Sequence, residues 1–167
     1  MNEHEEQYIH FALCIDNLNS AWRILQEIKR QKENLLIGVA FQFALIEYSK
    51  PYKESYSSIL NSKGKLIHKH KLGKEFIPQK HLALHERIIR IRDEILAHTD
   101  LGIREAKVHI RKTDHGKYIG MSQNIIRGTE EMEQIDDIID LIENTLDAMY
   151  IEATRLESAT FDDENKT

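Results

Sequence analysis

The chain has 167 residues, of which 41% are hydrophobic and 31% are charged, a composition typical of a single soluble globular domain. A net charge of −5 argues against indiscriminate binding to nucleic acid, although it leaves room for a local basic patch. The one cysteine, Cys14, excludes an internal disulfide and fits a reducing, cytoplasmic environment.

No membrane attachment is predicted. The N-terminal sequence MNEHEEQ is acidic, whereas a signal peptide starts with basic residues and continues with apolar ones. The longest nearly apolar run, residues 35–46, is shorter than the roughly 20 residues that span a bilayer. We expect residues 1–160 to form one domain and residues 161–167 to form an acidic, solvated tail.

The first predicted helix covers approximately residues 3–31, because large apolar side chains recur every three or four positions and mark one face. These side chains are Tyr8, Phe11, Ile15, Leu18, Trp22, Leu25 and Ile28. A second helix, capped by Asn34 and ending at Ser49 ahead of Pro51, is apolar around nearly its whole circumference. We therefore expect the second helix to be the most buried element.

The segment between Asn61 and Pro78 has no sustained period and is predicted as a loop. Its lysines are candidate contacts to a nucleic-acid backbone: Lys63, Lys65, Lys69, Lys71 and Lys74. The alternative is that these lysines only keep an exposed loop soluble.

A third helix is predicted from about Pro78 to His98, and a fourth from about Thr129 to Leu156. Between them, alternating apolar residues from 108 to 119 flank the turn-forming sequence DHG and predict a β-hairpin. The predicted fold class is all-α, an up-and-down bundle of four main helices with a small inserted hairpin.

Arg92 is unusual because it falls in the middle of the apolar arc of the third helix, on the same line as His81 and His85. A buried guanidinium without a partner is strongly unfavourable. Arg92 therefore either pairs internally, with Glu47 of the second helix as the acceptor, or lines a cleft that receives an anion such as phosphate. On a regular helix His98 lies about 120° from Arg92, so the two converge only if the helix end is irregular or a second copy contributes.

The sequence RDEILAHTD, residues 92–100, resembles the R-x4-6-H motif of HEPN domains (higher eukaryotes and prokaryotes nucleotide-binding). Arg92 and His98 match the defining pair, and Asp93 matches the polar residue that commonly follows the arginine. Thr99 and Asp100 match the ending often seen in bacterial members. HEPN domains are helical bundles with this motif on a late helix, which agrees with the predicted architecture.

The resemblance implies a metal-independent endoribonuclease without a cofactor, acting as a homodimer in which two motifs face one cleft. Arg92 would hold the scissile phosphate and His98 would assist proton transfer, with Asp93, Thr99, Glu47 and His85 in supporting positions. Such proteins serve as toxins of toxin–antitoxin pairs or in abortive infection, a bacterial defence against phage. The expected partners are RNA, a second copy, and an antitoxin or nucleotidyltransferase.

Other hypotheses remain open. A non-catalytic HEPN-like bundle would use the same cleft to bind a nucleotide, a nucleic acid or a partner protein. A plain helical interaction protein would bury Arg92 against Glu47. The spacings His81–His85 and His68–His70 suit metal chelation, although nine histidines produce such pairs by chance.

Overall fold

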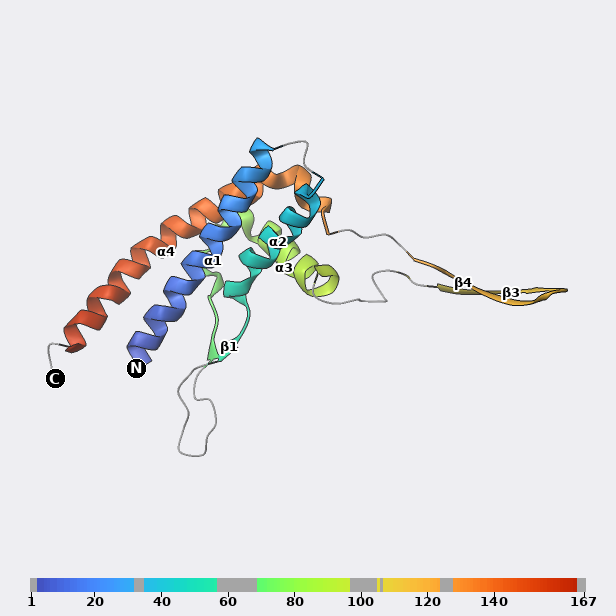
Figure 1. Cartoon of the computed structure of the whole chain (residues 1–167). Coiled ribbons are helices and arrows are strands. Elements are labelled where there is room, and N and C mark those ends of the chain that lie inside the picture. The colour runs from blue at the N-terminus through green and yellow to red at the C-terminus, as the bar shows by residue number, and fades with distance from the viewer. Residues whose placement is uncertain are drawn as a thin grey trace, which may run out of the picture.

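The computed structural model describes residues 3–31, 35–56, 69–96, 105, 107–123 and 128–164. Its α-helices are α1 (Glu3–Arg30), α2 (Ile37–Ser49), α3 (Leu82–Ile91) and α4 (Ile135–Glu164). Strands β3 (Lys107–Thr113) and β4 (Gly116–Ser122) form an antiparallel hairpin between α3 and α4 (Figure 1). The predicted combination of four helices and an inserted hairpin is confirmed.

The long helix α1 packs against both α2 and α4, and it runs antiparallel to each of them (Figure 1). Its predicted apolar face is its buried face, since Phe11, Ile15, Leu18, Leu25 and Ile28 are all buried. From α4 the core receives Ile138, Leu141, Ile142, Leu146 and Met149. Trp22 is only partly buried, and its indole Nε1 donates a hydrogen bond of 2.7 Å to Glu143 Oε1 on α4.

As expected, α2 has the largest share of buried residues among the four α-helices, but it is not buried on all sides. Phe41 and Leu45 are fully buried, but Val39 is 62% exposed and Phe43 is 51% exposed. The reason is that α2 packs on α1 along one side while its other contacts are with short elements, so part of its apolar surface faces solvent. The predicted cap, Asn34, lies outside the described residues.

The third helix is shorter and less regular than predicted. α3 follows a single 3-10 turn, η3 (Gln79–His81), and gives way at Arg92 to a π-helical segment, η4 (Arg92–Leu96). Its apolar residues Leu84, Ile88 and Ile91 join the core. The last part of the predicted helix, residues 97 and 98, lies outside the described residues.

Polar contacts fasten this part of the chain to the fourth helix. Lys80 Nζ and His81 Nε2 each donate to Asp140 Oδ2 at 2.6 Å, and these hydrogen bonds lower the pKa of Asp140 to about 2. Arg87 donates to both carboxylate oxygens of Glu131, at 3.0 and 3.1 Å. Glu131 belongs to η5 (Glu130–Gln134), the 3-10 turn that leads into α4.

Short elements occupy the described part of the predicted loop. After α2, η1 (Lys50–Tyr52) leads into β1 (Ser55–Tyr56), which pairs antiparallel with β2 (Lys69–His70). A further 3-10 turn, η2 (Lys74–Phe76), precedes α3. The chain thus returns past the end of α2 before it enters the third helix, which brings β2 and the residues after it close to η1.

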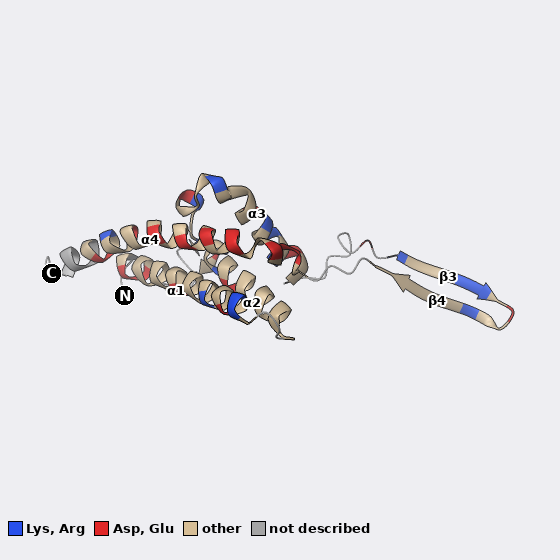
Figure 2. Ribbon diagram, turned by 90° about the horizontal axis from the view of Figure 1, so that it is seen from above, with Lys and Arg blue, Asp and Glu red and all other residues tan. Residues whose placement is uncertain are grey.

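The β3–β4 hairpin stands away from the helices in both views (Figures 1 and 2). Every described residue from 107 to 123 is exposed. Where the hairpin joins the helices, Gly128 packs closely against Leu96. The approach is so close that a Cβ added to Gly128 would lie only 2.5 Å from Leu96 Cδ2. Gly128 also has a φ of +68°, a conformation that favours glycine. The positions on either side of the hairpin insertion are therefore in contact.

The fourth helix is longer than predicted, because α4 continues past Leu156 to Glu164 and takes in part of the predicted tail. In the part of the chain that the structure describes, no helix combines the length and the apolar character needed to cross a bilayer.

Two leucines on α1 test the assignment of its buried face. Leu18→Ala removes a fully buried side chain and is expected to lower the free energy of unfolding by about 2–5 kcal/mol in urea denaturation. Leu13→Ala is the matched control, since Leu13 is 56% exposed, and its effect is expected to stay within about 0.5 kcal/mol. Equal effects of the two substitutions would contradict the packing of α1.

Candidate basic site around Arg92

Arg92 is the first residue of the π-helical segment η4. A π-helix forms i→i+5 hydrogen bonds and therefore turns through a smaller angle per residue than an α-helix, so the regular spacing assumed for the third helix ends at Ile91. Single π-turns inside α-helices occur frequently at functional sites. The Arg92 side chain is 29% exposed, and its ion pair is with the adjacent Asp93, at 3.0 Å between Nη1 and Oδ1.

The proposed internal pair between Arg92 and Glu47 does not form. Glu47 is buried, with 6% of its surface exposed, and its carboxylate pairs with Lys50 Nζ at 2.5 Å. Three residues separate Glu47 from Lys50, so this pair is local to the end of α2 and η1. Arg92 is consequently not neutralised by a carboxylate inside the core.

Asp93 connects Arg92 to a second cation from a distant part of the chain. Lys53 Nζ lies 2.5 Å from Asp93 Oδ2, while Arg92 occupies the other carboxylate oxygen. Partial burial opposes ionisation of Asp93, but hydrogen bonds from Lys53 and Arg92 outweigh it and lower the pKa of this carboxyl group. One carboxylate therefore holds two cations side by side, and the three groups together keep a net positive charge.

Lys53 also lines a pocket of about 280 Å³. Two further lysines, Lys71 and Lys74, contribute to its wall, and Tyr52 and His85 also line it. The remaining lining residues are Leu72, Gly73 and Ile89. Three cationic side chains around a partly apolar cavity form a surface that suits an anionic group attached to an apolar or aromatic one.

His85 is a neutral group on the wall of this pocket. It is only 2% exposed, and burial together with the nearby Lys74 and Lys71 lowers its pKa to about 4. Its Nδ1 lies 2.7 Å from Tyr48 Oη, and its ring contacts Tyr52 edge to face with 4.5 Å between centroids. With Nδ1 engaged by Tyr48, Nε2 is the ring nitrogen that remains for a ligand.

Tyr52 adds a buried hydroxyl to the pocket. The residue is 4% exposed, and burial raises the pKa of its hydroxyl well above the ordinary value. The Tyr48 hydroxyl interacts with it electrostatically, but no described residue forms a well-oriented hydrogen bond with Tyr52 Oη. A buried hydroxyl in this state gains from a polar ligand atom.

The structure brings together several residues that the sequence predicted separately. Lys71, Lys74 and His85 line one pocket, and Arg92 and Asp93 connect to it through Lys53. Lys69 belongs to β2. Four other candidates, Lys63, Lys65, His98 and Thr99, lie outside the described residues.

Sequence reasoning missed Lys53 and Tyr52. Their only signal is the sequence KPYK, residues 50–53, in which two lysines flank a proline and an aromatic residue at the end of a helix. Nothing in that pattern indicates that Lys53 meets Asp93, which follows 40 positions later.

The histidine pair considered for metal binding has other partners. His81 contacts Asp140, whereas His85 contacts Tyr48. Within the described ranges, no three His, Cys, Asp or Glu side chains are grouped so as to hold a metal ion. Burial raises the pKa of Cys14 to about 12, which fits a packing role for this thiol.

No family model matches the chain, and neither a curated protein nor a solved structure matches it.

The low pKa of His85 predicts a pH-dependent loss of stability. Between pH 6.5 and about 4 the unfolded chain binds a proton at this histidine and the folded chain does not, so the free energy of unfolding falls as the pH is lowered. The loss is at most about 3.5 kcal/mol, since the pKa falls from 6.5 to about 4 and one pKa unit corresponds to about 1.4 kcal/mol.

Urea denaturation at a series of pH values measures this effect. His85→Gln is expected to flatten the dependence between pH 6.5 and 4. His115→Gln, which changes an exposed histidine in the hairpin turn, is expected to leave the dependence unchanged. A His85→Gln variant with the wild-type pH dependence would contradict the assignment.

Proposed function

We propose that the protein is a metal-independent endoribonuclease of HEPN type, in which Arg92 and His98 cleave RNA. The observation that carries the proposal is that Arg92 is partly exposed and is not paired with a carboxylate inside the core. It is a partly exposed guanidinium at the start of a π-turn, oriented by Asp93 and linked through Lys53 to a lysine-lined pocket. This arrangement presents cationic groups to a phosphodiester.

The chemistry follows from these groups. The guanidinium of Arg92 binds the phosphate oxygens and stabilises the charge that develops on them during the reaction. His98 assists proton transfer, either from the attacking 2′-hydroxyl or to the departing 5′-oxygen. The 2′-oxygen forms a bond to phosphorus as the bond from phosphorus to the 5′-oxygen breaks. The products are a 2′,3′-cyclic phosphate and a 5′-hydroxyl, with no water consumed in this step.

Asp93 positions the guanidinium, and Thr99 is placed by the motif beside His98. The lysines Lys71 and Lys74, together with Lys63, Lys65 and Lys69, extend contact along the RNA backbone, which makes binding sensitive to salt. The active form is a homodimer in the cytoplasm with two motifs in a shared cleft. Its role is that of a toxin or a phage-defence protein, held in check by an antitoxin or a nucleotidyltransferase.

A second candidate function is binding of a nucleotide without cleavage. The pocket lined by Lys53, Lys71 and Lys74 favours it, because it combines cationic side chains with the neutral His85 and the buried hydroxyl of Tyr52. The lysines would hold the phosphates, and the apolar wall formed by Leu72 and Ile89 would contact the base.

Substitution of the arginine tests the nuclease. Arg92→Ala is expected to lower the cleavage rate of single-stranded RNA by about 100-fold or more, because one transition-state donor is lost. Arg90→Ala is the matched control, since Arg90 is two positions away with its side chain 64% exposed, and it should cleave normally. Product ends are identified by mass spectrometry, with EDTA present to exclude metal-dependent contaminants.

His98→Ala is expected to lose cleavage to a similar extent, and both variants should relieve growth arrest caused by induced expression. Unchanged cleavage in Arg92→Ala and His98→Ala would remove the nuclease proposal.

A charge-matched pair of variants tests the nucleotide pocket. Lys71→Gln is expected to weaken binding of a nucleoside monophosphate by about tenfold in isothermal titration, which corresponds to about 1.4 kcal/mol for one charge-assisted contact. Lys112→Gln removes the same charge from the hairpin and should leave the affinity unchanged. Equal affinities of the two variants would exclude the pocket as the binding site.

A further inference from the structure

The β3–β4 hairpin concentrates positive charge in an acidic chain. Residues 107–123 hold four basic residues against a single acid, Asp114, whereas the whole chain has a net charge of −5. The four basic residues are Lys107, Arg111, Lys112 and Lys117. None of the four forms an ion pair with a residue that the structure describes, whereas Lys29, Lys74 and Lys80 each pair with a carboxylate. Basic residues mark the hairpin and acidic residues line α4 (Figure 2), so the hairpin is the part of the chain that attracts a polyanion.

The two strands divide their side chains between two faces. Directly paired residues of an antiparallel ladder point to the same side, and the side alternates along the strands. One side, the polar face, carries the pairs Lys107–Ser122, His109–Gly120 and Arg111–Tyr118. The opposite face carries the pairs Val108–Met121, Ile110–Ile119 and Lys112–Lys117. Two of the four cations therefore share the polar face with an aromatic ring.

Tyr118 has open space beside it on its own strand. Its neighbours two positions away, on the same face, are Gly116 and Gly120, and Tyr118 itself is 56% exposed. A Cβ added to Gly120 would meet no heavy atom within 4 Å beyond its chain neighbours, and the φ of Gly120 is not positive. Neither packing nor backbone conformation therefore requires a glycine at position 120. A glycine inside a strand often marks the close approach of a ligand or of another backbone.

The groups around Gly120 are those that contact nucleotides. Arg111 is paired with Tyr118, and His109 is paired with Gly120, where His109 Nε2 lies 2.7 Å from Ser122 Oγ. Unpaired bases stack on aromatic rings and guanidinium planes, and cationic side chains contact the phosphates. An exposed tyrosine beside an empty position, with cations on the same face, suits a single strand of nucleic acid.

The hairpin is attached to the segment that carries the candidate catalytic arginine. η4 begins at Arg92 and ends at Leu96, and the insertion follows it directly. Where the chain returns, Gly128 packs against Leu96. Both ends of the insertion thus join the molecule at η4, which makes the hairpin continuous with the candidate site.

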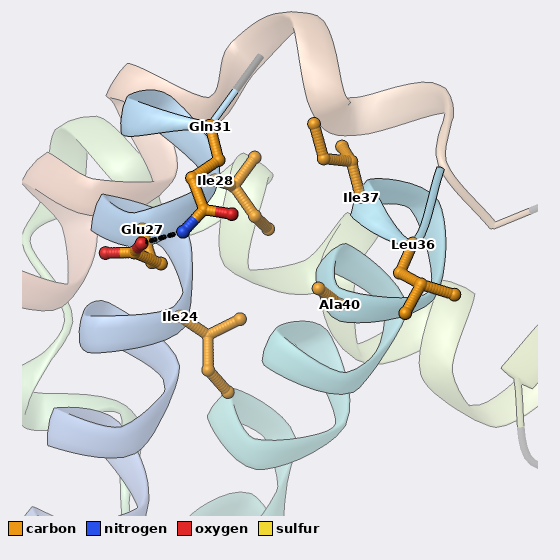
Figure 3. Close-up of a pocket in the computed structure, with 7 residues that line it drawn as sticks. All are labelled: Ile24, Glu27, Ile28, Gln31, Leu36, Ile37 and Ala40. Atoms are coloured by element: carbon orange, nitrogen blue, oxygen red, sulfur yellow. Dashed lines mark hydrogen bonds between the residues drawn. The ribbon is translucent and has the colours of Figure 1, made fainter. Parts of the chain in front are cut away.

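The groove between α1 and α2 does not offer the same chemistry. It has a volume of about 190 Å³ and a largely apolar lining that includes Ile24, Ile28 and Leu36 (Figure 3). Its charged lining residue, Glu27, is an acid that hydrogen-bonds to Gln31 (Figure 3). An acidic, apolar groove does not attract a polyanion.

We propose that the polar face of the hairpin binds a single strand of RNA. Tyr118 stacks on one base in the space beside Gly120, and Lys107 and Arg111 contact the phosphates. That the strand is RNA rests on the proposed function, whereas the binding itself does not require cleavage. Because a base must be unpaired to stack on a side chain, single strands bind in preference to duplexes. The contacts are with base faces and the backbone, so binding tolerates many sequences.

Filling the space beside Tyr118 tests the stacking contact. Gly120→Val is introduced into the Arg92→Ala chain, which leaves RNA intact, and binding of a labelled single strand of about 12 nucleotides is measured by fluorescence anisotropy. The affinity is expected to fall about 5-fold or more, because one stacked base is lost. Valine favours a strand, so the hairpin itself is retained. Met121→Val is the matched control on the opposite face and should leave the affinity unchanged.

The salt dependence of binding tests the phosphate contacts. Lys107→Gln with Arg111→Gln is expected to reduce the slope of log affinity against log salt concentration by about 1.4, since each phosphate contact to a single strand contributes about 0.7. Lys112→Gln with Lys117→Gln removes the same charge from the opposite face and should leave the slope unchanged.

Several outcomes would overturn the proposal. They are an unchanged affinity in Gly120→Val, equal changes of slope in the two double variants, and tighter binding of duplex than of single-stranded RNA. Variants of the polar face that lose binding to vesicles of anionic phospholipid but keep their RNA affinity would assign this face to a membrane and would equally overturn it.

The same measurements separate this proposal from the nuclease. A chain that binds RNA through the polar face but does not cleave it would remove the nuclease and support the binding face. A chain that cleaves RNA, with an affinity that none of the polar-face substitutions changes, would overturn the binding face and leave the nuclease in place.

Discussion

The structure depends first on the burial of one face of α1 between α2 and α4. Leu18, Ala21 and Leu25 on this face are completely inaccessible to solvent, and they contact apolar residues of both neighbouring helices. Burial of such side chains is the main favourable contribution to folding. Because α1 occupies this central position, α2 packs mainly on α1, and some of its apolar side chains, such as Val39 and Phe43, stay exposed.

The candidate site is organised by electrostatics at a different place in the same fold. Asp93 neutralises part of the repulsion between Arg92 and Lys53 and keeps the two cations near each other. Ion pairs at partly exposed positions, such as those of Asp93 with Arg92 and Lys53, contribute little to the free energy of unfolding. Their main effect is to orient the two cationic side chains. Lys71 and Lys74 extend the positive surface over the pocket, and their charges help to keep His85 neutral. In the proposed nucleotide pocket, a neutral His85 beside these lysines would contact an anionic ligand without adding a buried charge of its own.

Part of the apolar surface of α2 and every described residue of the β3–β4 hairpin stay exposed. The contact between Gly128 and Leu96 holds the two ends of the insertion together at the body.

The sequence alone determined the elements whose apolar residues recur with a regular period. The buried face of α1, the fourth helix and the register of alternation in the hairpin are all visible in the residue spacing, because local backbone geometry decides which side chains share a face. Tertiary structure decided the rest. The sequence shows that α2 is apolar nearly all round but not which of its sides neighbouring elements cover, so the exposure of Val39 and Phe43 was not predictable. The pairing of Arg92 with Asp93 rather than Glu47, the approach of Lys53 and the hydrogen bond between His85 and Tyr48 depend on distances between segments far apart in the chain. Spacing along a single helix carries no information about those distances.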